Sequence, residues 1–132
     1  MFELKPLSPE AIPAALEKAR HYRLLNEPAQ AESICLDILE VESDHQEALV
    51  TLLLALTDQF HHHLGQKFRE AQQVLPRIQE GYRRHYYRGI LHERRAHAHL
   101  RHGGPGCGDL AYHEFRLAIE AYDEAIPVQV GS

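Results

Sequence analysis

The sequence of 132 residues lacks several features that would assign it to a class of protein at once. Only two cysteines are present, Cys35 and Cys107, which excludes a disulfide-bonded scaffold and a four-thiolate zinc site. No stretch approaches the roughly 20 consecutive apolar residues of a membrane span. Lysine and arginine together number 14 against 19 acidic residues, so the chain lacks the positive charge of a general nucleic-acid binder. We therefore expect neither membranes nor nucleic acids as partners.

The first eight residues also lack the apolar run of a signal peptide, because they include Glu3 and Lys5. A cytoplasmic protein is therefore expected. The composition, 44% hydrophobic and 25% charged, is typical of a folded protein, and the length suits a single domain over residues 1–132.

Signals for β-strands are almost absent, because β-branched residues are sparse and no alternating run exceeds a few residues. Apolar residues instead recur every three or four positions, which predicts an all-α protein. Ser8 and Pro9 mark the first helix start, Asn26 suits a left-handed turn, and Gly65 and Pro127 predict breaks. The six expected helices span about residues 9–25, 28–42, 45–62, 66–80, 82–101 and 109–126.

Six helices in three hairpins indicate a helical repeat. The segment 12–45 resembles a tetratricopeptide repeat (TPR), a helical hairpin of 34 residues. Its small, aromatic and turn positions would be filled by Ala19, Tyr22, Asn26 and Ala31. Segments 46–79 and 82–126 resemble the repeat less closely. The resemblance implies a short right-handed α-solenoid of about three TPR-like hairpins, a fold that usually binds other proteins in its concave groove.

The motifs Tyr86-Tyr87-Arg88-Gly89-Ile90 and Gly103-Gly104-Pro105-Gly106 also resemble a group of bacterial TPR-like proteins, a resemblance that implies a fold and gives no information on activity. Motifs of enzymes are missing. The glycine loop is not followed by Lys-Ser or Lys-Thr, and His92 and His97 are five residues apart where a zinc protease needs four. We expect a protein with no catalytic activity and no cofactor.

Charge is concentrated in one segment. Residues 77–102 hold seven arginines and two glutamates, a net charge of +5, whereas residues 1–58 hold four basic and eleven acidic residues, a net charge of −7. Two interpretations stay open. The basic helix could pack between acidic helices of the same chain, or it could bind an acidic partner.

The basic helix carries a stripe at spacings of 3, 4, 3 and 4 residues, made of His85, Arg88, His92, Arg95 and His99. If this helix is the first of its hairpin, the TPR resemblance places the stripe in the concave groove. The same register places Arg20, Arg23 and Asp58 there. The sequence therefore predicts a protein–protein interaction module, an adaptor, that binds an acidic segment through these residues.

The eleven histidines leave an alternative function open. A carboxylate–histidine metal site or oxidase could use Asp58, His61, His62, Glu93 and His97. The run His61–His63 could equally be a solvated helix end. Glu93 also lies among apolar residues of its helix, so we expect it to pair with an arginine.

The last helix has more apolar surface than one neighbour can cover. One face includes Phe115 and Tyr122, and a second face is made of Leu110, Leu117 and Ala121. We expect no further helix to cover this second face, although the end of a solenoid needs a polar surface. We therefore expect a homodimer with its interface at these three residues.

Overall fold

The computed structural model describes residues 7–130, and the side chains through residue 126. Residues 1–6 and 131–132, the two ends of the expected domain 1–132, lie outside the described residues. Within residues 7–130 there are six α-helices and no strand, which confirms the all-α prediction. None of these helices is both long enough and apolar enough to cross a membrane. Two short 3-10 turns, Pro9–Ala11 and Leu75–Arg77, adjoin the helices. The helices are α1 Ile12–Leu24, α2 Pro28–Val41, α3 Gln46–Thr57, α4 Phe60–Val74, α5 Gly81–His102 and α6 Cys107–Val130.

Local sequence signals explain where most helices begin and end. Asn26 has φ of 60°, the left-handed conformation that asparagine tolerates better than most residues, and it turns the chain between α1 and α2. Pro28 then occupies the first turn of α2, where its missing N–H is not needed. At α3 the ring Nδ1 of His45 accepts a hydrogen bond from the backbone N–H of Ala48 at 3.1 Å. The turn at Asn26 follows the prediction, whereas the cap at His45 was not predicted.

The junction between α3 and α4 differs from the prediction. The chain turns at Asp58 and Gln59, and Gly65, the expected break, lies inside α4. Distant partners hold this turn: Gln59 Nε2 donates to Glu32 Oε1 at 2.7 Å, and Asp58 pairs with Arg23 of α1. A kink remains within α4 at His63, with φ of −140° and ψ of 48°.

The end of the last helix also lies beyond the expected one. α6 continues to Val130, whereas Pro127 was expected to end it. A proline removes one backbone donor and strains one turn, so it weakens a helix without always terminating it.

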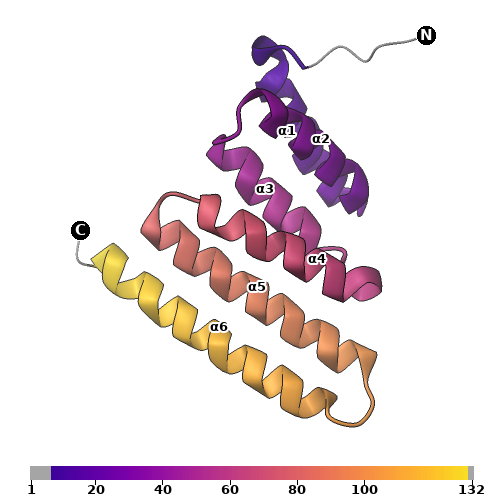
Figure 1. Ribbon diagram of the computed structural model, residues 1–132, viewed down its shortest axis with the longest axis vertical. Coiled ribbons are helices and arrows are strands. Elements are labelled where there is room, and N and C mark those ends of the chain that lie inside the picture. Colours follow the sequence, from indigo (N-terminus) through magenta and orange to yellow (C-terminus); the bar gives the residue numbers. More distant parts are fainter. Residues whose placement is uncertain (1–6, 131–132) are drawn as a thin grey trace.

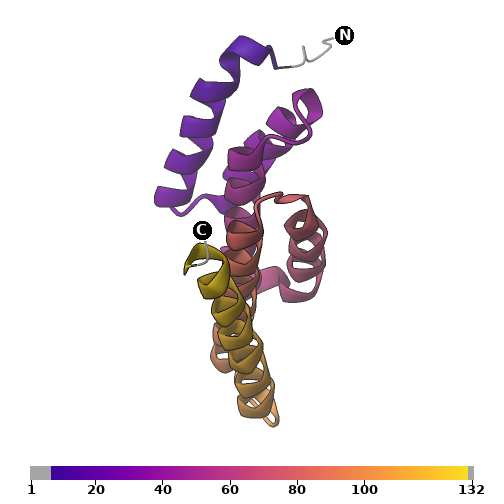
Figure 2. The same cartoon turned by 90° about the vertical axis from the view of Figure 1, so that its left-hand side faces the viewer.

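The helices are arranged in chain order. Each packs mainly against the helices before and after it, and α1 also contacts α3, as α3 contacts α5. Figure 1 shows α1 and α2 at one end of the molecule and the α5–α6 hairpin at the other. In the turned view of Figure 2 the α5–α6 hairpin forms the long, narrow end of the molecule.

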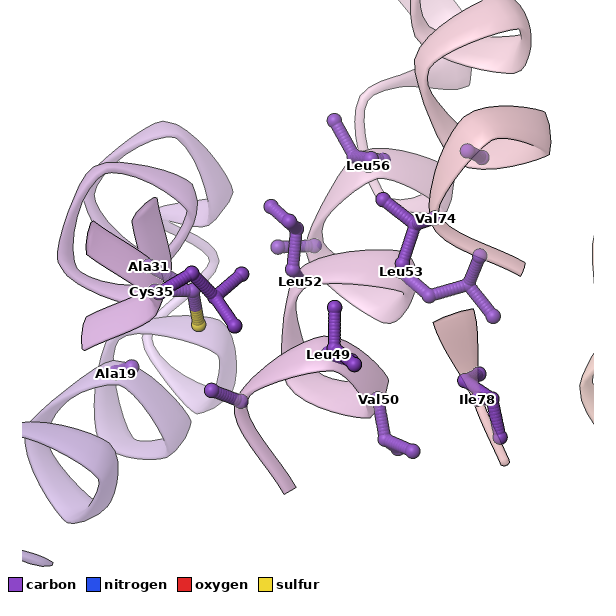
Figure 3. Close-up of a cluster of buried hydrophobic side chains, with 14 of the residues drawn as sticks. Ala19, Ala31, Cys35, Leu49, Val50, Leu52, Leu53, Leu56, Val74 and Ile78 are labelled. Carbon is purple, nitrogen blue, oxygen red and sulfur yellow. The ribbon is translucent and has the colours of Figure 1, made fainter. Parts of the chain in front are cut away.

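The apolar core is centred on α3. Leu49, Leu53 and Leu56 are almost fully buried, and nearly every residue of this helix is shielded from water. Figure 3 shows these leucines between Cys35 of α2 on one side and Ile78 on the other. α3 is therefore the central helix, as its apolar character predicts.

The α5–α6 pair is joined by small residues. Gly89 of α5 lies so close to α6 that an added Cβ would meet the Tyr122 ring at 2.4 Å. Every fully buried alanine of α6 lies on the side that packs against α5: Ala111, Ala118, Ala121 and Ala125. Ala121 therefore cannot belong to an external interface, and the predicted apolar face is wrong at this residue. Leu110 is exposed and Leu117 is half-buried.

Candidate functional site

Two clusters of charge join α1, α3 and α5. In the first, Glu47 of α3 accepts from Arg20 of α1 at 2.9 Å and from Arg83 of α5 at 2.9 Å. In the second, Asp58 lies between Arg23 of α1, at 2.7 Å, and Arg94 of α5, at 3.4 Å. We call these the two arginine–carboxylate–arginine triads. Each triad has one more positive charge than negative.

The spacing of these residues explains the repetition. Glu47 and Asp58 are eleven residues apart, and so are Arg83 and Arg94. Eleven residues are about three helical turns, so both members of each set emerge from the same side of their helix. α3 and α5 are in contact, so Arg83 meets Glu47 near the start of the two helices and Arg94 meets Asp58 three turns further along.

The triad at Asp58 adjoins two cavities that share Phe60, His61, Ala98 and Arg101. One, of about 390 Å³, is lined by the Asp58 triad and by His97. The other, of about 640 Å³, is lined by the start of α4 and the end of α5. Together they form what we call the histidine–arginine groove. Its polar lining consists of Arg23, Asp58, His61, His62, Arg94, His97, His99, Arg101 and His102, with Asn26 and Thr57 at one end.

The groove is positively charged. Arg23, Arg94 and Arg101 face a single carboxylate, Asp58, so three positive charges and one negative charge leave a net charge of +2. Among the described residues, Arg101 has no carboxylate within 4 Å; its guanidinium lies against the ring of His61. Arg101 is therefore the cation of the groove that is least neutralised by the chain itself.

Two histidines of the groove resist protonation. Burial lowers the pKa of His61, and the nearby Arg101 guanidinium lowers it further. Burial likewise lowers the pKa of His99, with a contribution from Arg95. Both rings are therefore neutral at neutral pH, and these two rings gain charge only in acid.

The predicted stripe on α5 does not form this groove, apart from His99. His92 Nδ1 lies 2.6 Å from Glu114 Oε2, and Arg95 donates to Glu114 Oε1 at 3.1 Å. His85 and Arg88 both pair with Glu124 of α6. These four residues therefore pair with acidic side chains of the chain itself, and their binding of a partner stays a prediction.

The reason lies in the orientation of α5. The Arg95 guanidinium stacks on the Phe68 ring of α4 at 3.8 Å, so the stripe faces α4 and α6. Residues advance by about 100° along a helix, so Arg94, two positions after His92, points to the other side, toward α1 and α3. On the side of α5 that faces α4 and α6, the basic helix therefore packs against acidic side chains of its neighbours, as one of the two interpretations predicted. The side that faces α1 and α3 keeps an excess of positive charge.

Of the remaining predicted partner-binding residues, Arg23, Asp58 and His99 line the groove, and Arg20 lies in the neighbouring triad. Sequence reasoning missed Arg94 and Arg101. These two arginines are seven residues apart, the repeat of one helix face, and that spacing could have identified them.

The alternative metal site is not assembled. Among the described residues, no group of three or more potential ligands is close enough to hold an ion. Asp58 is already paired with two arginines, and the ring of His97 contacts Phe115 edge-on. His61 and His62 line the groove, but Glu93 lies beside Tyr122, whose pKa burial and the charge of Glu93 raise to about 12. Glu93 also has no arginine partner in the described part of the chain, so that prediction is wrong.

The two thiols are unsuited to nucleophilic chemistry. Cys35 is fully buried, and burial raises its pKa to about 12. Cys107 is buried at the start of α6, and its thiol donates to the carbonyl of Gly103 at 2.6 Å. A thiolate, the reactive form, is therefore disfavoured at Cys35.

Comparison with known proteins assigns no relative. No protein-family model matches the chain, and no curated protein or solved structure matches it either.

Proposed function

We propose that this protein is a TPR-like interaction module without catalytic activity, and that it binds an acidic segment of a partner protein in the histidine–arginine groove. The order of the helices supports a repeat architecture, because each helix packs against its sequence neighbours. The contacts of α1 with α3 and of α3 with α5 also support it, because a short solenoid brings the first helices of successive hairpins into contact.

The observation that carries the proposal is the imbalance of charge in the groove. Arg101 has no carboxylate partner within the described residues, and Arg23 and Arg94 share one carboxylate between them. A guanidinium offers five N–H donors, so this arrangement leaves donors free for an incoming carboxylate. A partner that supplies aspartate or glutamate would complete the set.

The groove also orients its cations. Asp58 holds Arg23 through two bonds, from Nε at 2.7 Å and from Nη2 at 3.2 Å, so this guanidinium is fixed before a ligand arrives. Fixed donors lose less conformational freedom on binding. Leu64 lines the same groove and is half-buried, so it offers apolar contact to the residues that flank an acidic side chain.

The proposal is tested with a short fluorescent peptide rich in Asp and Glu, and with a peptide of the same length in which Asn and Gln replace them. Fluorescence anisotropy should show binding of the acidic peptide only, and the affinity should fall as salt is added. Arg101→Glu should weaken binding by about tenfold or more, because one charge-assisted bond becomes a repulsion.

Arg69→Glu is the matched control. Arg69 is an exposed arginine of α4 that does not line the groove, so its reversal changes the net charge equally. The proposal is wrong if both reversals weaken binding to the same extent, or if the acidic and amide peptides bind equally well. Far-UV circular dichroism of each variant confirms that the helices are intact.

A further inference from the structure

α6 carries an apolar stripe that the described residues of the chain cover only in part. Its residues follow one another at spacings of 3, 4, 3 and 4, the heptad spacing of helices that pair with other helices. Three of them are strongly exposed: Tyr112 at 64%, Ile119 at 57% and Ile126 at 55%. The α6 stripe consists of Tyr112, Phe115, Ile119, Tyr122 and Ile126.

The two flanks of the stripe differ sharply. On one flank lie alanines that are buried on the α5 side: Ala111, Ala118 and Ala125. On the other flank, away from α5, charged residues occur every seven positions: Asp109, Arg116 and Asp123. All three charged residues are exposed, and in the described part of the chain none of them forms an ion pair. Arg116 only donates to the Tyr112 hydroxyl, at 3.4 Å.

We propose that α6 pairs with α6 of a second copy of this chain, antiparallel and related by a two-fold axis. In this register Ile119 packs on the partner's Tyr122, and Phe115 packs on the partner's Ile126. Arg116 then faces the partner's Asp123, and the symmetry forms this ion pair twice. The charged flank of one α6 is thus complementary to the same flank of the second copy.

The charge pattern selects the antiparallel orientation. In a parallel pair, each charged flank would face the alanine flank of the other helix, and no ion pair would form. In the antiparallel pair the two charged flanks face each other, with opposite signs at the centre. A partner other than a second copy would need to reproduce both the heptad spacing and this charge order.

The surface extends onto α5, which widens the contact. Tyr86 of α5 lies 5.9 Å from Tyr122, ring centre to ring centre, and is itself exposed. His97 contacts Phe115 in the same way at 5.4 Å, and Leu100 nearby on α5 is half exposed. Figure 1 shows α6 as the outermost helix at its end of the molecule, with α5 as its neighbour. A second α6 could therefore reach this side of the hairpin.

The test uses charge reversal across the two-fold axis. Light scattering should give the mass of a dimer for the unaltered chain. Arg116→Asp and Asp123→Arg should each shift the chain toward the monomer, because each variant places two like charges opposite each other. The double variant, Arg116→Asp with Asp123→Arg, restores both pairs with exchanged signs and should recover the dimer.

Glu120→Arg is the matched control, because Glu120 is an exposed charge of the same helix that lies off the stripe. It should leave the mass unchanged. A second test joins the two copies covalently. The double variant Arg116→Cys with Asp123→Cys should form a disulfide-linked dimer on mild oxidation, because position 116 of one copy faces position 123 of the other.

The proposal is overturned if the unaltered chain is a monomer at high concentration. It is also overturned if the double variant fails to recover the dimer while circular dichroism shows that it is folded. The groove and its acidic peptide play no part in these measurements, so the two proposals stand or fall separately.

Discussion

At the scale of single residues, Glu114 is the most constrained charge in the molecule. Its side chain is buried, and both carboxylate oxygens are used, one by His92 and the other by Arg95. A buried carboxylate is stable only when such partners compensate for its lost hydration. The stripe predicted to bind a partner thus has a structural role in joining α5, α6 and α4.

Glu114→Gln should therefore destabilise the fold by about 1–3 kcal/mol, since it leaves the Arg95 charge without its carboxylate. The expected loss of stability is smaller than for a fully buried ion pair, because the Arg95 side chain is one-third exposed and water partly solvates its charge. Urea unfolding followed by circular dichroism measures the change. Glu124→Gln is the control: Glu124 is exposed beside Arg88, and its replacement should leave the unfolding midpoint unchanged. Equal effects of the two variants would contradict the structural role.

The sequence predicted some single-residue features whose cause is local, although the local signals at Gly65 and Pro127 did not end a helix. Asn26 adopts the left-handed turn as expected, because this preference belongs to the residue itself. Asp58 and Gln59 were assigned to a helix, because their turn depends on Arg23 and Glu32, more than 25 residues away. No local pattern reports such partners.

At the scale of helices, the α5–α6 contact depends on the absence of a side chain at Gly89. Alanine is a better helix former than glycine by about 1 kcal/mol, so a free helix would gain from Gly89→Ala. In this protein the new Cβ would meet the Tyr122 ring at 2.4 Å, and the two helices would have to separate.

We expect Gly89→Ala to lower the free energy of unfolding by about 1–3 kcal/mol, as in other overpacked contacts. Thermal and urea unfolding measure the effect. Gly81→Ala is the control, because a Cβ there meets no atom within 4 Å. Helix propensity alone predicts that Gly89→Ala stabilises the protein. That result would contradict the close packing of α5 against α6 at this residue.

Six helices were predicted, and six are present in the described residues. The prediction of which side of each helix packs against which neighbour was less accurate. Periodicity shows which residues share a side of a helix, but it does not show which neighbour that side meets. The stripe of His92 and Arg95 was therefore assigned to a groove, while Arg94, the neighbouring residue in the chain, lines it. The same limit explains why Ala121 was taken for an interface residue although it packs inside the hairpin.

At the scale of the whole molecule, the proposed binding and the stability of the fold should respond to pH in opposite ways. The pKa values of His61 and His99 are lowered in the folded protein, so both rings gain a proton only below their usual value of about 6.5. Added positive charge strengthens binding of an acidic peptide. The unfolded chain binds these protons more readily, so the free energy of unfolding falls as the pH drops below that value.

Anisotropy at pH 8 and pH 5.5 should show tighter binding at the lower pH, and an Asp-rich peptide stays ionised over this range because the pKa of aspartate is about 3.9. The variant with asparagine at positions 61 and 99 should lose part of this dependence. The urea midpoint of the free protein should decrease over the same interval. Equal affinity at both pH values would show that the two rings do not sense the ligand.

The distribution of the apolar core has a consequence for how the molecule opens. The cluster of buried apolar residues comes almost entirely from α1 to α4 and the segment that follows them, with Leu91 and Ala98 from α5 and none from α6. α6 can therefore detach without exposing that cluster to water, and its amides should exchange with solvent ahead of those in α3. We therefore expect the described part of the chain to open as two units, with α5 as the element they share. A ligand held by α6 would slow exchange in the second unit alone.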